Sequence, residues 1–184
     1  MIRIMITFVA LGALAACGSA PKTGTGPGYP GWTGHQSGPA AFDGNKALYA
    51  VGIGKSRMTN LARTEACEKA RVELGKFINT KINAAFQGYA SSVSDGKNEN
   101  AGKKAQEGMV NRVKMNLSGV GCAKMFKAMD TGEWYALAKY DAASVKGILA
   151  DMKKQLASLD TLDPQKEAKI NALSDKFQKE ILGE

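Results

Sequence analysis

LYAVGIG at residues 48–54, followed after a short connection by LARTEACEKAR at residues 61–71, decides the fold of this chain. In the first segment, Tyr49, Val51 and Ile53 alternate with alanine and glycine, which is the period of a half-buried β-strand. One face of this strand is bulky and the other is nearly bare. We therefore expect a strand whose bare face lets another element approach closely.

A long helix is expected after this strand, because Thr59 or Asn60 can cap its N-terminus and apolar residues then recur at three- and four-residue steps. The apolar stripe consists of Ala62, Ala66, Ala70, Leu74, Phe77, Ile78, Ile82, Ala85 and Tyr89. Its first turns are alanines, so the helix can lie close against the glycines of the strand.

Two later segments, residues 120–129 and 134–140, predict strands joined by the tight turn DTGE at 130–133, in an antiparallel hairpin. A helix over residues 145–159 then returns to the sheet or packs on a neighbour. The expected fold class is α+β. We predict a domain over residues 46–160 in which a small three-stranded antiparallel-type sheet is packed by the long helix, with additional C-terminal helices.

The last segment, residues 161–184, predicts an amphipathic helix that begins at Asp163-Pro164, a cap followed by a first-turn proline. Its narrow apolar stripe consists of Ile170, Leu173, Phe177 and Ile181. This stripe can fold back onto the domain or pack against a second copy, and we name it as a candidate self-association surface. It is too short to establish a coiled coil.

The first 16 residues, MIRIMITFVALGALAA, are typical of a bacterial lipoprotein signal peptide. Arg3 supplies the positive start, the apolar run is too short for a stable membrane span, and LAAC at residues 14–17 forms a lipobox. We expect cleavage before Cys17 and lipidation of its thiol and freed amine. The alternatives are an ordinary cleaved signal peptide or an uncleaved anchor helix.

Residues 17–45 are crowded with Gly, Pro, Ser and Thr and show no apolar period, which predicts a flexible tether after the lipidated cysteine. Gly18, and not aspartate, follows Cys17, which favours the outer membrane with the body of the protein in the periplasm. Tyr29 and Trp32 can touch a membrane or a partner, but isolated aromatic residues in a linker are more often incidental.

The chain is basic, with a formal net charge of +8 that includes Arg3. Such a surface can lie against anionic lipid headgroups or acidic groups of the cell wall, and a solvated lysine-rich surface is the simpler interpretation. We expect no nucleic-acid partner, because none is present in the periplasm. The expected partners are the membrane, through the lipid, and a second copy or another envelope protein.

Three cysteines are present, and lipidation of Cys17 would leave Cys67 and Cys122. Cys67 lies near the apolar face of the predicted helix and Cys122 lies in a predicted strand, so the two can meet across a helix-on-sheet core. An oxidising compartment would allow a disulfide between them. Two buried unpaired thiols are nearly as compatible with the sequence.

The sequence contains no complete catalytic or cofactor-binding motif. GIGKS at residues 52–56 lies between a strand and a helix, but Tyr49 stands where a Walker A loop needs its first glycine. The only histidine, His35, lies in the predicted tether, and no C-x-x-C pair is present. The candidate carboxylates are Glu65, Glu68, Glu73, Glu133 and Asp141. We expect them to be solvated charges or helix-face partners of Lys69, Arg71 and Lys76. We predict no enzymatic activity, cofactor or metal site.

Residues 48–54 and 61–71 together resemble the opening of the LPP-twenty lipoprotein family, in which a YAVGIG strand leads into an A-R-x-x-A-x-x-x-A-R helix. Residues 120–121 and 132–138 are similar to the closing strands of that family, and the resemblance covers about residues 47–146. It implies a long helix on a three-stranded sheet and an envelope lipoprotein without a known enzymatic activity. Some relatives are structural parts of flagellum-associated assemblies.

The sequence therefore predicts an outer-membrane-anchored periplasmic lipoprotein with a structural or protein-interaction role, lipidated at Cys17 and able to self-assemble. The alternative is an envelope module that contacts peptidoglycan or regulates a cell-wall enzyme.

Overall fold

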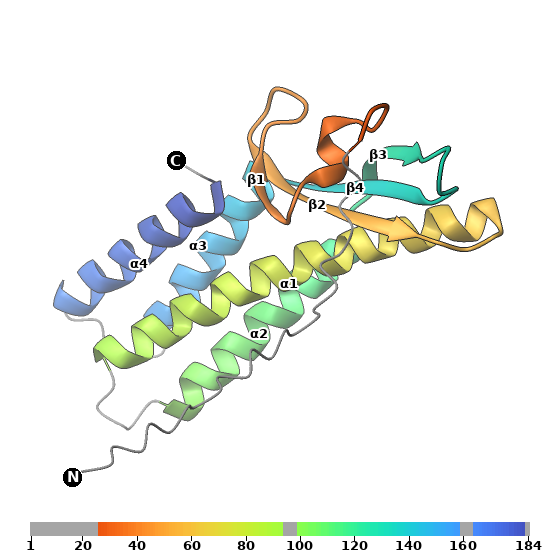
Figure 1. Ribbon diagram of the computed structural model, residues 1–184. Helices are drawn as coiled ribbons and strands as arrows, with labels where there is room; N and C mark the ends of the chain where they lie inside the picture. Colours follow the sequence, from red (N-terminus) through yellow and green to blue (C-terminus); the bar gives the residue numbers. More distant parts are fainter. Residues whose placement is uncertain (1–25, 94–98, 159–163, 183–184) are drawn as a thin grey trace, which may run out of the picture.

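The computed structural model describes residues 26–93, 99–158 and 164–182 (Figure 1). The predicted signal peptide, the predicted lipidation residue Cys17 and the first part of the predicted tether lie outside these residues. The elements in chain order are η1 (Gly31–Gly34), β1 (Gly38–Ala40), β2 (Ala47–Gly54), α1 (Thr59–Val93), α2 (Glu99–Ser118), β3 (Cys122–Lys127), β4 (Trp134–Asp141), α3 (Ala142–Ser158) and α4 (Pro164–Leu182).

The predicted α+β class is confirmed, but the sheet has four strands and not the predicted three. All its pairs are antiparallel, in the order β1-β2-β4-β3. The hairpin of β3 and β4 matches the prediction, and β2 pairs with β4 along its whole length, from Ala47 opposite Asp141 to Gly54 opposite Trp134. The additional strand is β1, in which Gly38 lies opposite Tyr49.

The second half of the predicted tether is part of the folded domain, which corrects the assignment of residues 17–45 to a flexible segment. Residues 26–45 cover the face of the sheet that α1 leaves open, and Trp32 is buried there beside Tyr49 and Leu137. The aromatic residues of this segment supply the apolar surface that a disordered linker lacks. The glycines and prolines supply the turns that fold it onto the sheet.

The opposite face of the sheet is covered by the first half of α1, at very short distance. A Cβ atom built on Gly52 would lie 2.1 Å from the carbonyl oxygen of Ala66, and one built on Gly54 would lie 1.9 Å from that of Ala62. Neither position has room for a side chain. The expected close approach of alanines to strand glycines is therefore present.

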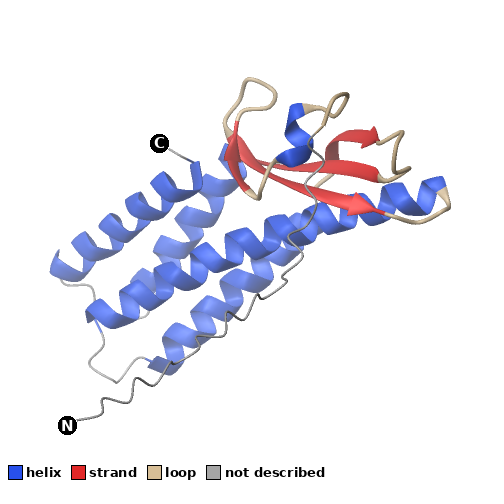
Figure 2. Cartoon of the chain, in the orientation of Figure 1, coloured by secondary structure: helices blue, strands red, loops and turns tan. Residues whose placement is uncertain are grey.

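The second half of α1 extends past the sheet and packs against α2 and α4, and α3 packs against these same two helices (Figure 2). The core of this helical end is made of large apolar side chains from all four helices, including Leu74, Ile78, Ile82, Met109 and Met152. At this end of the domain α1 ends at Val93 and α2 begins at Glu99.

Candidate functional site

The first of the described residues lie beside the turn between β3 and β4. The hydroxyl of Tyr29 donates a hydrogen bond of 2.7 Å to Asp130 in this turn. The Tyr29 ring also contacts Phe126 at 5.4 Å and Tyr135 at 5.6 Å between centroids. The segment that leads from the predicted lipidation residue Cys17 therefore meets the folded domain at this end of the sheet.

The two remaining cysteines are brought together. Cys67 of α1 and Cys122 of β3 form a disulfide, with their Cα atoms 5.8 Å apart. Of the alternatives that the sequence left open, the structure contains the bridge and not the free thiols. It ties the sheet edge to α1, across the small cluster that Cys67 forms with Ala66 and Ala136.

The candidate self-association stripe is folded against its own chain. Ile170 and Phe177 are each only 4% exposed and belong to the main hydrophobic core, in which α4 packs against α3 and α1. The side chains of Leu173 and Ile181 lie outside the described residues. Because half of the stripe is already covered, it cannot serve as an open surface for a second copy, and the predicted self-association site is wrong for Ile170 and Phe177.

The three candidate carboxylates on α1 pair with cations of the same helix, as expected, and the other two bind elsewhere. Glu65 bonds Lys69 and also accepts the backbone N–H of Lys55, and this pairing lowers the pKa of Glu65. Glu68 bonds Arg71, and Glu73 bonds Lys76. Glu133 pairs with Lys55, and Asp141 accepts a hydrogen bond from the backbone N–H of Ser144. Asp141 thereby caps the N-terminus of α3.

The only histidine is held in the layer over the outer face of the sheet. His35 Nε2 lies 3.3 Å from the carbonyl oxygen of Gly38, and the ring packs on Phe42. Among the described residues, no hydrogen bond joins this histidine to a serine or a carboxylate. Within the described part of the chain, we also find no group of three or more His, Cys, Asp or Glu residues that could hold a metal ion.

A polar cluster that sequence analysis missed fixes the loop between β1 and β2. Asp43 accepts a 2.6 Å hydrogen bond from the Tyr49 hydroxyl and pairs with Lys139. These hydrogen bonds, first from Lys139 and then from Tyr49, hold the pKa of Asp43 far below its usual range. Burial and the Asp43 carboxylate raise the pKa of Tyr49. The only sequence signal was an acidic residue in a segment assigned to the tether.

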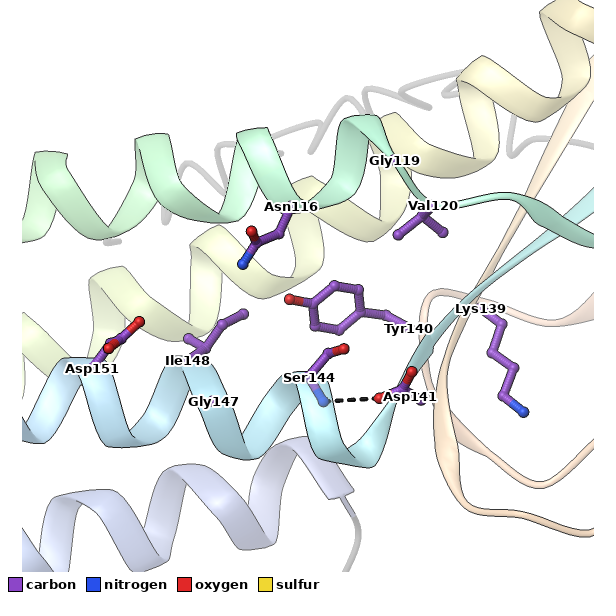
Figure 3. A pocket seen from close by; sticks show the side chains of 10 residues that line it. All are labelled: Asn116, Gly119, Val120, Lys139, Tyr140, Asp141, Ser144, Gly147, Ile148 and Asp151. Atoms are coloured by element: carbon purple, nitrogen blue, oxygen red, sulfur yellow. Dashed lines mark hydrogen bonds between the residues drawn. The ribbon is translucent and has the colours of Figure 1, made fainter.

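An open groove of about 450 Å³ lies between the end of α2, the end of β4 and the start of α3 (Figure 3). Asn116 and Tyr140 point into it from opposite sides, and burial raises the pKa of the Tyr140 hydroxyl. Asp151 at its far end pairs with Arg112. The groove offers hydrogen-bonding groups, and its two carboxylates, Asp141 and Asp151, are bonded to the backbone N–H of Ser144 and to Arg112.

The sheet has two edge strands, β1 and β3, and β3 is the longer of the two. β3 pairs only with β4, and three of its six side chains are exposed, namely Ala123, Met125 and Lys127. Beside it, the guanidinium of Arg63 lies over the Trp134 ring at 5.3 Å. Within the described residues, neither Arg63 nor Lys127 forms an ion pair.

Across the part of the chain that the structure describes, no helix combines the length and apolar character needed to span a membrane. No protein-family model matches this chain, and no curated protein has a matching sequence.

Proposed function

We propose that this chain is a lipoprotein of the outer membrane, anchored through Cys17, whose periplasmic domain binds another envelope protein and has no enzymatic activity of its own. The observation that carries the proposal is the free edge of β3. An edge strand presents unpaired backbone N–H and C=O groups, and an extended segment of a partner can add to it as a further strand. Exposed Met125 offers an adaptable apolar contact in the same place.

The charge of this edge selects the kind of partner. Lys127 is exposed on β3, a β-bulge interrupts the register between Cys122 and Lys124, and Arg63 lies over Trp134, the residue of β4 that pairs with Lys127. Edge lysines and bulges oppose pairing with a second copy of the same edge. They favour a partner strand that carries carboxylates and apolar residues.

Two further observations support the location. A disulfide such as Cys67–Cys122 persists in oxidising compartments, of which the bacterial periplasm is one. The resemblance to the LPP-twenty family, whose members are envelope lipoproteins, points to the same compartment. We place the lipid on Cys17 because it ends the lipobox at residues 14–17.

The lipid anchor is tested by growing cells with labelled palmitate. The wild-type chain should take up label that resists detergent washing, and Cys17→Ser should take up none. Label that persists in the Cys17→Ser chain would contradict the assignment of this residue.

The binding edge is tested by placing a photo-crosslinking amino acid at position 125 in cells, with position 115 on α2 as the control, because Met115 is 68% exposed. We expect a discrete adduct with a second protein from position 125 only. Lys127→Glu should abolish this adduct, whereas Lys114→Glu, an exposed lysine of α2, should leave it unchanged. An adduct between two copies of this chain, or no adduct above the control, would contradict the proposal.

The alternative, capture of an acidic cell-wall component, rests on the excess of positive charge. Co-sedimentation with purified peptidoglycan that disappears with added salt would favour it over the β3 edge.

A further inference from the structure

The end of the sheet at which the chain joins the domain also exposes large apolar side chains. Met129, in the turn between β3 and β4, is 90% exposed. Met58, just before α1, is 70% exposed, and Leu61, in its first turn, is 55% exposed. Together with the exposed Arg57 these residues form what we call the end surface. It shares no residue with the β3 edge, which ends at Lys127, two positions before Met129.

The two segments that carry the end surface are linked to each other. Lys55 of the β2–α1 connection forms a 2.9 Å ion pair with Glu133 of the β3–β4 turn. Gly54, which ends β2, also lies opposite Trp134, which begins β4. Figure 1 shows both segments at one end of the molecule, with the C-terminal end of α1 at the opposite end. The exposed apolar residues therefore share one end of the domain.

The length of chain before this end limits its distance from the membrane. Gly26 lies nine positions after Cys17, the residue predicted to carry the lipid. A flexible segment of this length has a root-mean-square span of about 15 to 18 Å, and a fully extended one reaches about 30 Å. Tyr29 then attaches the chain to Asp130, next to Met129. The end surface is thereby kept within reach of the lipid headgroups.

Exposed apolar side chains beside a cation match the chemistry of a lipid surface, with methionine and leucine among the headgroups and arginine at the phosphates. Arg57 forms no ion pair among the described residues, so its charge is available to a phosphate. We propose that the end surface contacts the lipid surface that holds Cys17, so that the domain stands with its helical end pointing away from the membrane. This inference rests on the proposed lipid anchor.

The test uses the lipidated mature chain in vesicles of phosphatidylethanolamine and phosphatidylglycerol that carry spin-labelled lipid headgroups. A fluorophore is attached at Leu61→Cys, and the matched control is Gln87→Cys, an exposed position near the other end of the same helix. At 1.5 Å per residue, the two positions lie about 39 Å apart along α1. Cys67 and Cys122 are joined in the disulfide, so the dye reacts with the new thiol.

We expect the lipid spin labels to quench the dye at position 61 at least several-fold more than the dye at position 87. A second pair, Met129→Cys against Met115→Cys, should give the same contrast.

Flotation of the vesicles distinguishes the failure of the orientation from the failure of the lipid anchor. If the chain floats but both dyes are quenched equally, the orientation is wrong and the anchor stands. If the chain does not float, the anchor is wrong and the orientation fails with it.

Discussion

The two halves of α1 show how side-chain size selects what a helix packs against. In the first half the buried stripe is Ala62, Ala66 and Ala70, and the helix backbone touches the glycines of β2. In the second half the stripe continues with Leu74 and Ile78, and the partners are other helices. Large side chains hold neighbouring helices about 8 to 10 Å apart, whereas alanine and glycine allow almost direct backbone contact. One apolar period thus supports two kinds of interface.

The largest effect is expected at Gly52 and Gly54, where the backbone of the alanine half of α1 leaves no room for a side chain. Gly52→Ala with Gly54→Ala should destabilise the protein by about 5 kcal/mol, because each new Cβ atom would overlap a backbone oxygen and not a movable side chain. The measurement is the free energy of unfolding from urea titration, together with the folded yield from the periplasm.

Gly121→Ala is the matched control, since no heavy atom lies within 4 Å of a Cβ atom at that position. Its stability should stay within about 0.5 kcal/mol of the wild type. If the double variant were as stable as this control, the close contact between α1 and β2 would be refuted.

The second effect concerns the disulfide, which reinforces the alanine half, where small side chains bury little apolar area. Cys67→Ala with Cys122→Ala should lower the free energy of unfolding by about 4 kcal/mol, because the bridge closes a loop with a sequence separation of 55 in the unfolded chain. Wild-type protein in reductant should lose a similar amount. A loss below about 1 kcal/mol in both experiments would show that the sheet end does not depend on the bridge.

The third effect lies in the large-side-chain half. Ile82 is fully buried, and Ile82→Ala should cost about 3 kcal/mol because it leaves a cavity between helices. Ile82→Val should cost about 1 kcal/mol. Equal costs for the two variants, measured by urea unfolding, would mean that the helical end collapses around the cavity. The two halves of α1 would then differ less in packing than their side chains indicate.

Much of the fold was predictable because periodicity reports which face of an element is covered. The alternation in β2 and the three- and four-residue steps of α1 each persist over enough residues to identify the element. β1 was not predictable in this way, because Gly38–Ala40 is only three residues long and has no apolar alternation. Its pairing depends on residues 26–45 folding over the sheet, which no local pattern encodes.

The site was less predictable, since its parts come from distant segments. The lipobox marks Cys17 by its local sequence, but the contact of Tyr29 with Asp130 joins residues that are 101 positions apart. The stripe of α4 could equally cover its own domain or a second copy, and periodicity alone does not distinguish the two. The structure puts Ile170 and Phe177 in the intrachain core.

The smallest expected effect is a pH dependence of stability that arises on only one face of the sheet, the face covered by residues 26–45. Tyr135 lies in the layer formed with residues 26–45, where burial and then the charge of Glu133 raise its pKa to about 12. Below the ordinary tyrosine pKa of about 10 it is neutral in both folded and unfolded chains. Between about pH 10 and 12 the unfolded chain ionises first, so the stability that this group contributes is lost as the pH rises.

Tyr135→Phe removes this titration, so its stability relative to the wild type should improve as the pH rises from 9 to 12. Urea titrations of both proteins at several pH values in this window measure the difference directly. Parallel curves would mean that Tyr135 ionises as readily in the folded chain as in the unfolded one. Residues 26–45 would then not exclude water from the outer face, and only the face packed by the alanines of α1 would be a dry interface.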